Sequence, residues 1–386
     1  MNQTVDDAAI VYDVHPADPG AHLFEVTCRV DGPDPGGQVF SLPAWIPGSY
    51  LIRDYARHVI SVSAESDGAA IPLRKTDKHT WRAAAATGPL LIRATIYAHD
   101  ASVRGAYLDY DRAFFNGVCL FFRIHGMENE RCVVHLAAPA DGQWVVATSM
   151  QRLTGADEEF GAFVAPGYDE LIDQPVMMGP LSCIRFDVAG KQHLVAFSGG
   201  LDTDFDRLQA DMQQICAGHV ELFGGTPPFD RYVFLVIVRN GGYGGLEHRN
   251  SSALICSRDD LPRTARTDMT SGYRSFLGLV SHEYFHLWNV KRIRPAEFVP
   301  CSLDREAYTR QLWVFEGITS YYDDLGLLRA ARITPESYLE LLGRTLTAVY
   351  RAGGRRRQTL EEASFDAWIK FYKQDENAPN AIVSYY

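Results

Sequence analysis

The sequence lacks any apolar stretch that approaches the ~20 residues needed to cross a bilayer. It also lacks a basic excess, because 37 lysines and arginines face 48 aspartates and glutamates, for a formal net charge of −11. Nucleic-acid-binding proteins need basic patches, so this balance argues against such a partner. The sequence contains no internal repeats or low-complexity segments. We therefore expect a globular protein that binds neither a membrane nor nucleic acid.

The seven cysteines form no CxxC pair, and their number is odd. A scattered, unpatterned set of this kind is typical of reduced thiols. The first ten residues, MNQTVDDAAI, contain neither the basic nor the apolar region of a signal peptide. Both observations favour a cytoplasmic protein, while a secreted or periplasmic form is left open.

The first part of the chain has the patterns of a β-rich domain. With 386 residues, the sequence is long enough for two or three domains. Residues 22–30, HLFEVTCRV, alternate apolar with polar side chains, which is typical of a half-buried strand. Further strands are expected at residues 59–64, 91–97, 120–124, 133–136 and 144–148. Their spacing suggests a sandwich of antiparallel sheets.

Helical patterns dominate the second part. An apolar stripe from Phe205 to Phe223 predicts a helix that is ended by Gly224-Gly225. The run RYVFLVIV, residues 231–238, is predicted to be a buried strand. Thr334-Pro335 has the residue types that begin a helix, a capping hydroxyl followed by proline at the first position.

The most informative motif is HEYFH, in which His282 and His286 are four residues apart. Apolar residues from Tyr273 to Leu287 recur at helical spacing, so the motif is predicted to lie inside a helix. Residues four apart lie one turn above each other, and both imidazoles can then bind one metal ion. Glu283 would face the same ion and take a proton from the water that the metal activates. The alternative is a core helix with two packed histidines, which only a further ligand can reject.

A third metal ligand is predicted downstream. Catalytic zinc usually has three protein ligands and leaves the fourth position to water. A third histidine at the HExxHxxGxxH spacing is excluded, because Asn289 and Arg292 occupy its glycine and histidine positions. The segment LWVFEGITSYYDD offers Glu316, whose carboxylate would be costly among apolar neighbours without a cation. Asp323 and Asp324 follow in the same segment; they either orient a ligand histidine or, as we expect, lie in solvent.

A glycine-rich turn precedes the motif. After RYVFLVIV the chain passes through NGGYGG, residues 240–245, and enters LEHRNSSALIC. This stretch is either a flexible hairpin loop or a strand edge at which a substrate peptide pairs with the backbone. In the second case Gly244 and Gly245 would contact the substrate, and Glu247 would offer a negative charge to its free α-amine.

Together, GGLEH, HEYFHLWNVKRIRP and LWVFEGITSYYDD resemble the glycyl aminopeptidases, gluzincins that often carry a C-terminal PDZ domain. LPAWIPGSYLIRDYARHV and YLDYDRAFFNG resemble the β-rich first domain of that family, so the resemblance covers essentially the whole chain. It implies that His282, His286 and Glu316 bind one Zn²⁺ per chain. It also implies that Glu283 is the general base and then the general acid. No PDZ-like segment is visible.

The resemblance also implies roles in substrate binding. Glu247 matches the amine-binding glutamate of a GxMEN motif, although Leu246 and His248 replace its methionine and asparagine. Related enzymes place a tyrosine opposite the metal, where a donor stabilises the negative charge on the carbonyl oxygen. Tyr386 lies at the matching distance after the third ligand, and Tyr385 is the alternative. A pair of packing aromatics is the other interpretation of these two residues.

We therefore expect an α+β protein. Residues 1–170 are predicted to form an antiparallel β-sandwich-like domain. Residues 171–386 are predicted to form a thermolysin-like mixed sheet followed by helices that carry the site. The second domain is expected to be truncated at its C-terminal end, since a catalytic tyrosine is an improbable last residue.

The leading hypothesis is a zinc aminopeptidase that removes N-terminal residues from peptides with a free N-terminus. A preference for glycine or alanine is implied by the resemblance alone. Two alternatives stay open: a zinc endopeptidase, which would cleave blocked peptides internally, and a peptide-binding scaffold with a vestigial site. The intact Glu283 argues against the scaffold, which has no chemical need for it.

Overall fold

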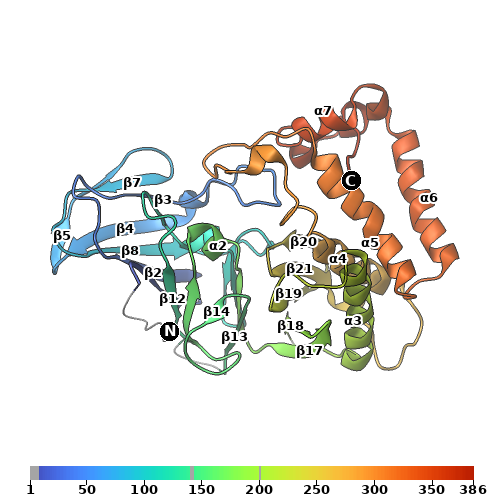
Figure 1. Cartoon of the computed structure of the whole chain (residues 1–386), viewed down its shortest axis with the longest axis horizontal. Coiled ribbons are helices and arrows are strands. Elements are labelled where there is room, and N and C mark those ends of the chain that lie inside the picture. The colour runs from blue at the N-terminus through green and yellow to red at the C-terminus, as the bar shows by residue number, and fades with distance from the viewer. Residues whose placement is uncertain (1–7, 140–142, 200) are drawn as a thin grey trace. The chain divides into compact units, whose positions relative to one another are not determined.

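The structure, a computed structural model, describes residues 8–139, 143–199 and 201–386 (Figure 1). Residues 1–7, the start of the predicted N-terminal domain, lie outside the described part. Strands fill the first half of the chain and helices dominate the second, which confirms the predicted α+β class. Of the helices that the structure describes, none is both long and apolar enough to cross a membrane.

The chain divides into two compact units. The first consists of Met1–Ile46 and Arg53–Ser182, and the second of Pro47–Ile52 and Cys183–Tyr386. A short segment from the N-terminal half therefore belongs to the helical unit. The predicted boundary lies near residue 170, and nothing in the sequence indicates this excursion, because so short a segment carries no periodicity of its own.

The first unit contains three sheets, whose strands are β1 (Ile10–Asp18), β2 (Leu23–Val30), β3 (Val39–Ser41), β4 (Val59–Ser66), β5 (Ala69–Ile71), β6 (Leu73–Lys75), β7 (Thr80–Ala83), β8 (Leu90–Tyr97), β9 (Ala106–Leu108), β10 (Ala113–Phe115), β11 (Arg123–Ile124), β12 (Cys132–Leu136), β13 (Val145–Thr148), β14 (Gln151–Arg152), β15 (Gly161–Ala165) and β16 (Val176–Gly179). The largest sheet has the order β14-β15-β12-β1-β2-β8-β4-β5, and the two smaller ones β13-β16-β10-β9 and β11-β3-β7-β6. Within the described residues, neighbouring strands run antiparallel except β1 and β12. This architecture confirms the sandwich-like domain.

Most of the strands predicted in this unit are present, and one prediction is wrong. β2, β4, β8, β12 and β13 occupy the predicted stretches. The strand predicted at residues 120–124 is instead the end of a short helix, α1 (Gly117–Leu120), followed by β11. Phe121 and Phe122 are fully buried side by side, so this run shows no alternation. A short apolar run does not distinguish a buried turn from a buried strand.

The second unit contains a mixed five-stranded sheet. Its strands, in spatial order, are β17 (Ser182–Val188), β18 (Lys191–Ser198), β19 (Arg231–Arg239), β21 (Ser251–Ser257) and β20 (Gly244–Glu247). β18, β19 and β21 are parallel, and β20 pairs antiparallel with β21 at the edge. β19 is the predicted RYVFLVIV strand and is buried from Tyr232 to Val238, as a central strand covered on both faces should be. The glycine-rich turn leads into this edge strand, so the predicted strand edge is present, and the pairing of a substrate peptide with it stays a prediction.

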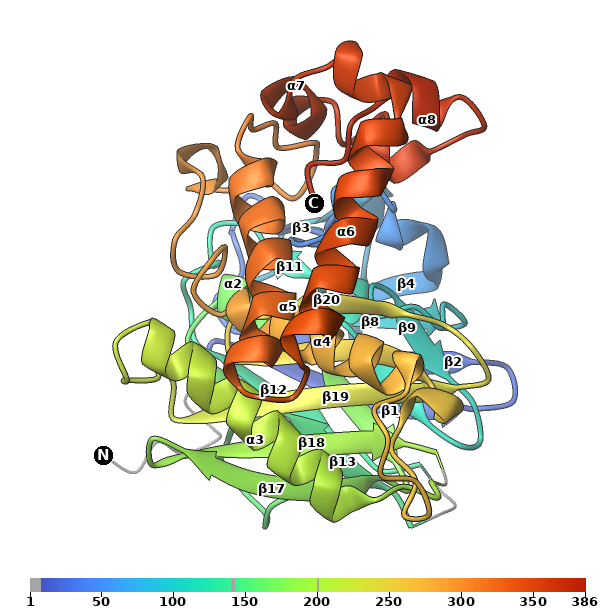
Figure 2. The ribbon, with the colours of Figure 1, turned by 90° about the vertical axis from the view of Figure 1, so that its right-hand side faces the viewer.

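Two helices, α3 (Phe205–Leu222) and α4 (Ser271–Phe285), cover one face of this sheet (Figure 2). α3 begins at Asp204, whose carboxylate accepts a hydrogen bond from the Arg207 backbone N–H at 3.0 Å. It ends before Gly224 and Gly225, which adopt positive φ angles, as the sequence predicts. The apolar faces of both helices and the strands beneath them form one buried core.

Two further helices extend the unit. α5 (Ile318–Arg329) packs against α4, and α6 (Pro335–Arg351) packs against α5 (Figure 2). The Thr334 hydroxyl accepts a hydrogen bond from the Ser337 N–H at 3.2 Å, so the predicted start of α6 is confirmed. The short helices α7 (Leu360–Phe365) and α8 (Ala378–Ala381) follow before the chain returns to its last residues.

His193 ties the sheet to α4 and gives the unit a pH dependence. Its Nδ1 donates to the Lys191 carbonyl at 3.0 Å, so its Nε2 accepts from the Tyr284 hydroxyl at 2.9 Å. Burial lowers the pKa of His193 to about 4, although the Lys191 carbonyl partly opposes this. Between about pH 4 and pH 6.5, the pKa values of His193 in the folded and unfolded chain, the unfolded chain therefore binds a proton that the folded chain does not bind.

We expect His193→Phe to flatten the pH dependence of stability. In the wild type, the contribution of His193 is present above pH 6.5 and is lost as the pH falls towards 4. The shift corresponds to on the order of 3 kcal/mol. Urea unfolding at pH 7 and pH 4.5, with a chelator present, measures it. The exposed His15, changed to Gln, is the control; an unaltered slope in His193→Phe would contradict the assignment.

Candidate metal centre

α4 places His282 and His286 one turn apart. The helix begins at Thr270, whose hydroxyl accepts from the Tyr273 N–H at 3.0 Å. It ends at Phe285, so the prediction that it encloses the whole motif is wrong by one residue. His286 is the first residue after the helix, but its backbone is still right-handed (φ −60°, ψ −19°). Its N–H still donates to the His282 carbonyl at 3.2 Å, which preserves the i, i+4 geometry.

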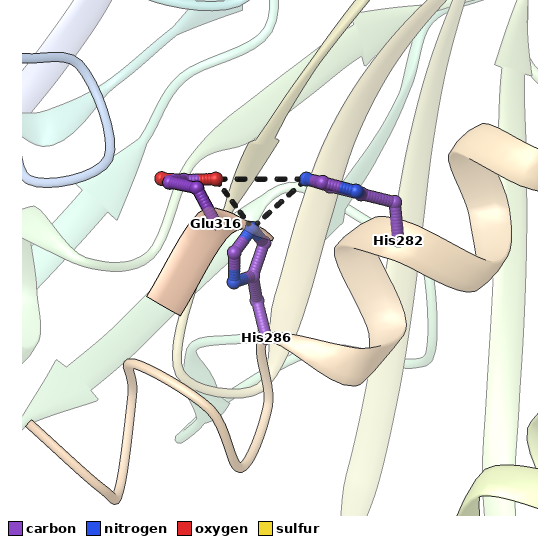
Figure 3. Close-up of side chains that lie close together, drawn as sticks. All are labelled: His282, His286 and Glu316. Carbon is purple, nitrogen blue, oxygen red and sulfur yellow. Dashed lines mark hydrogen bonds and ion pairs between the residues drawn. The ribbon is translucent and has the colours of Figure 1, made fainter. Parts of the chain in front are cut away.

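Glu316 joins the two histidines from a separate element. The two Nε2 atoms are 3.1 Å apart, and Oε2 of Glu316 lies 3.7 Å from Nε2 of His282 and 3.3 Å from Nε2 of His286 (Figure 3). His286 and Glu316 are buried, and the His282 side chain is only 13% exposed. The three groups therefore point at one small volume in the interior.

A π-helical turn carries Glu316. Residues Trp313–Gly317 form this turn immediately before α5. The wider turn changes which carbonyls are paired, and π-turns inside helices occur frequently at functional sites. The Asn289 amide donates to the Val314 and Phe315 carbonyls at 3.0 and 3.3 Å, which fixes the turn to the residues that follow α4.

The second ring nitrogen of each histidine has its own partner. Nδ1 of His286 donates to the Asn289 carbonyl at 2.9 Å, and Nδ1 of His282 lies 2.9 Å from the Asp323 carboxylate. A carbonyl cannot donate, so His286 has a proton on Nδ1. In the neutral ring, Nε2 then carries a lone pair that can bind a cation. The same assignment for His282 leaves two lone pairs and a carboxylate facing one another. Such a set of acceptors is stable only around a cation or with a proton bound between them.

The charges of this cluster are strongly coupled. Burial alone would lower the pKa of His282, but the Asp323 and Glu316 carboxylates raise it well above its usual range. Burial would raise the pKa of Glu316, but the neighbouring His286 and His282 hold it below its usual range. Positive charge is therefore favoured here, and a metal cation meets that need without protonating the ligands.

Asp323 was predicted to lie in solvent, and that prediction is wrong. Its side chain is 17% exposed, on the α5 face that meets α4. The hydroxyl of Ser281 also donates to the Asp323 backbone carbonyl at 2.8 Å, so α4 and α5 are joined next to His282. A carboxylate that orients a ligand histidine is a common companion of metal centres. The sequence shows that a carboxylate is present at this position, but it does not show that the carboxylate lies beside Nδ1 of His282.

Glu283 and Glu247 lie beside the three ligands. Oxygen atoms of these two carboxylates and a ring nitrogen of His286 lie within 4.8 Å of one another. Both carboxylates are buried, and Oε2 of Glu283 and Oε1 of Glu247 have no hydrogen-bond partner among the described residues. Burial raises the pKa of Glu283, while the two histidines oppose the rise. Unpaired carboxylate oxygens in the interior indicate that a cation or a proton donor belongs there.

The two glycines predicted to contact substrate are in β20. Gly245 pairs with Leu254, and Gly244 with Ile255. A Cβ at Gly245 would overlap Oε1 of Glu283 and lie 2.6 Å from its Cγ. The absence of a side chain at Gly245 is therefore required for Glu283 to reach the centre. The sequence suggested close approach of a ligand, and the structure shows close approach of Glu283.

The two C-terminal tyrosines have different surroundings. The ring of Tyr386 lies 6.2 Å from that of His282 at an angle of 20°, and its hydroxyl is 3.3 Å from that of Tyr372. Tyr385 is buried and packs on Phe371, with ring centroids 4.8 Å apart. Tyr386 is thus the tyrosine beside a candidate ligand. A cavity of about 590 Å³ between α5, α6 and the C-terminal residues has Tyr386 and Asp323 among its walls.

Two regions of the chain match known protein families. Residues 11–180 match the Peptidase M61 N-terminal domain, and residues 275–386 match the M61 glycyl aminopeptidase domain. These matches to one family together cover more than half of the sequence. The chain belongs to the M61 glycyl aminopeptidase family. The resemblance inferred from the motifs is confirmed.

A solved structure shares the fold of this chain. The chain is similar to the crystal structure of an aminopeptidase N family protein from Idiomarina loihiensis, with 44% sequence identity and a TM-score of 0.96. The match covers 98% of this chain and 64% of that chain. No curated protein matches the sequence.

Proposed function

We propose that this chain is a zinc-dependent aminopeptidase that removes residues from the free N-terminus of peptides, with small first residues such as glycine or alanine preferred. The observation that carries the proposal is the convergence of His282, His286 and Glu316 with two further buried carboxylates, Glu283 and Glu247. Membership in a peptidase family supports it. The preference for small residues rests on the family alone.

The donor set fits zinc. Two imidazoles and one carboxylate are a ligand set of catalytic zinc sites, which leave a position open for water. The partners of both Nδ1 atoms hold the rings with Nε2 towards the metal position. A zinc ion in this position would polarise the scissile carbonyl and lower the pKa of a water molecule beside it.

Glu283 would move the proton. Its carboxylate lies next to the ligand set, with one oxygen unpaired among the described residues. It would accept a proton from the attacking water and donate it to the departing amine. Burial raises the pKa of Glu283, and a bound cation would lower it again, so the carboxylate would be ionised and ready to accept a proton.

Tyr386 would stabilise the oxygen of the scissile carbonyl. Negative charge develops on this oxygen in the transition state, and a positioned hydroxyl can donate to it. The position of its ring beside His282 favours Tyr386 over the buried Tyr385 for this role. The hydroxyl of Tyr372 would hold that of Tyr386 in place.

Glu247 would bind the α-amine of the substrate, and its removal should be selective. A charge-assisted contact of this kind is worth roughly 1.5–3 kcal/mol, or about 10- to 150-fold in kcat/KM. We expect Glu247→Ala to lose that factor on alanine p-nitroanilide but little on propionyl p-nitroanilide, the same anilide without the amine. Glu221→Ala, an exposed carboxylate near the end of α3, is the control. Equal losses on both substrates would make Glu247 structural.

One assay tests the proposed activity. A peptide with a free N-terminus and its N-acetylated copy are each incubated with the zinc-loaded protein, and the products are identified by mass spectrometry. We expect stepwise loss of single residues from the free peptide only. Internal fragments from the acetylated peptide would instead indicate an endopeptidase, and cleavage of neither would indicate a binding protein.

A further inference from the structure

The segment Pro47–Ile52 belongs to the helical unit although it lies far from it in the sequence. Gly48, its second residue, has a φ of +90°, a conformation that residues with side chains rarely adopt. The segment is therefore built around a backbone that needs glycine. Neither the metal ligands nor the general base explain that need.

Glu247 occupies the space that a side chain at Gly48 would fill. A Cβ on Gly48 would lie 2.6 Å from Oε1 and 2.7 Å from Cδ of Glu247, and nearer still to Oε2. The carboxylate thus rests directly on the Gly48 backbone. Glu247 is 3% exposed, and its Oε1 has no hydrogen-bond partner among the described residues. The contact leaves no room on that side even for a methyl group, and so none for a further residue of a peptide.

Tyr50 anchors the segment. Its side chain is 1% exposed and packs edge-on against Trp368 and Tyr372, with ring centroids 5.8 and 5.6 Å apart. Phe298 completes the surrounding aromatic group at 6.0 Å. Burial raises the pKa of Tyr50 well above its usual range, and the charges of Glu316 and Glu247 add to the rise. These ring contacts fix Tyr50, and through it they hold the neighbouring Gly48 in position.

We propose that Gly48 is a positioning residue for amine recognition: its backbone fixes the Glu247 carboxylate and closes the site behind the first residue of the substrate. This inference rests on the proposed function, in which Glu247 binds the α-amine. The role of Gly48 also explains why only the N-terminal end of a peptide is accepted as substrate. A residue preceding the amine would have to pass between Glu247 and Gly48, where the two are already in contact.

A double-mutant cycle on Gly48 and Glu247 tests the proposal. The variants are Gly48→Ala, Glu247→Ala and the double variant, each assayed on alanine p-nitroanilide and on propionyl p-nitroanilide, which lacks the amine. The inhibition constant of alaninamide serves as a binding readout.

We expect Gly48→Ala to reduce kcat/KM on the free-amine substrate and to raise the inhibition constant of alaninamide, each by about tenfold or more, because the methyl group displaces the carboxylate. Cleavage of propionyl p-nitroanilide should be little affected. In the Glu247→Ala background, Gly48→Ala should change either measurement by less than about twofold, since coupling requires both groups.

Thermal unfolding separates this effect from backbone strain. Gly224 is the matched control, because its φ is +96° and no atom lies within 4 Å of the position that a Cβ would take. Gly224→Ala bears a similar conformational cost without a collision and should leave amine recognition unchanged. Gly48→Ala should melt below Gly224→Ala, and the loss of the Glu247 carboxylate in the double variant should restore part of the difference. This comparison of melting temperatures tests the contact between Gly48 and Glu247 even if Gly48→Ala folds poorly.

The outcomes distinguish amine positioning from amine binding. If Glu247→Ala is selective for free amines but Gly48→Ala is not, or costs the same in both backgrounds, the positioning role is wrong and the proposed function stands. If Glu247→Ala shows no selectivity, amine binding by Glu247 is wrong, and the role of Gly48 falls with it.

Discussion

Glu283→Gln should abolish turnover while the protein keeps its fold and its metal. The amide has nearly the shape of the carboxylate, so it fits the space that Gly245 leaves open. It cannot accept the proton of the attacking water. General acid–base catalysis typically contributes about 10²–10⁴-fold, and the loss of the only base should reach at least that range. Steady-state kinetics on alanine p-nitroanilide measure the loss.

Metal content and melting temperature are the controls for Glu283→Gln. Both should match those of the wild type, because Glu283 is not among the three ligands proposed. The fall should appear in kcat, with KM little changed, since the interaction belongs to the transition state. Near-normal turnover by a variant with one metal per chain would refute the role of Glu283.

Glu316→Gln should release the metal. The carboxylate supplies the only negative charge in the ligand set, and an amide oxygen is a much weaker partner for zinc. We expect the metal content after dialysis to fall from one per chain to a small fraction, with activity lost in parallel. Elemental analysis of the dialysed protein measures this directly.

Asp323→Asn provides a graded comparison with Glu316→Gln. Asp323 holds His282 and does not face the metal, so its loss should weaken metal binding by about 10- to 100-fold without removing a ligand. Excess zinc should therefore restore activity to Asp323→Asn and not to Glu316→Gln. If zinc restored both equally, Glu316 would be a supporting residue and the ligand set would have to be reassigned.

Local patterns in the sequence predicted the elements that hold the centre. The stripe that became α3, the apolar run of β19 and the Thr334 cap all depend on neighbours within a few residues. At residues 120–124 the predicted strand is wrong because Leu120, Phe121 and Phe122 are all buried in succession, and periodicity carries no information there. The excursion of residues 47–52 was missed for a related reason: it depends on contacts with residues hundreds of positions away.

In the site, too, the features that depend on neighbouring residues were predictable, and those that depend on distant residues were not. His282 and His286 are related by one helical turn, so their joint position was predictable from spacing. Glu316 was predictable as a buried carboxylate, but the π-helical turn that aims it was not. Asn289 was noted only as a departure from another motif, yet it binds His286 and the turn of Glu316 together. Such supporting contacts join distant segments, and no local pattern encodes them.

Diffraction at the zinc absorption edge, from crystals grown with zinc, tests the central claim most directly. We expect one anomalous peak per chain, at about 2.0–2.2 Å from Nε2 of His282, Nε2 of His286 and a carboxylate oxygen of Glu316. A peak at Asp323 and Asp324 instead, or a bound ion with Glu316 remote from it, would contradict the account.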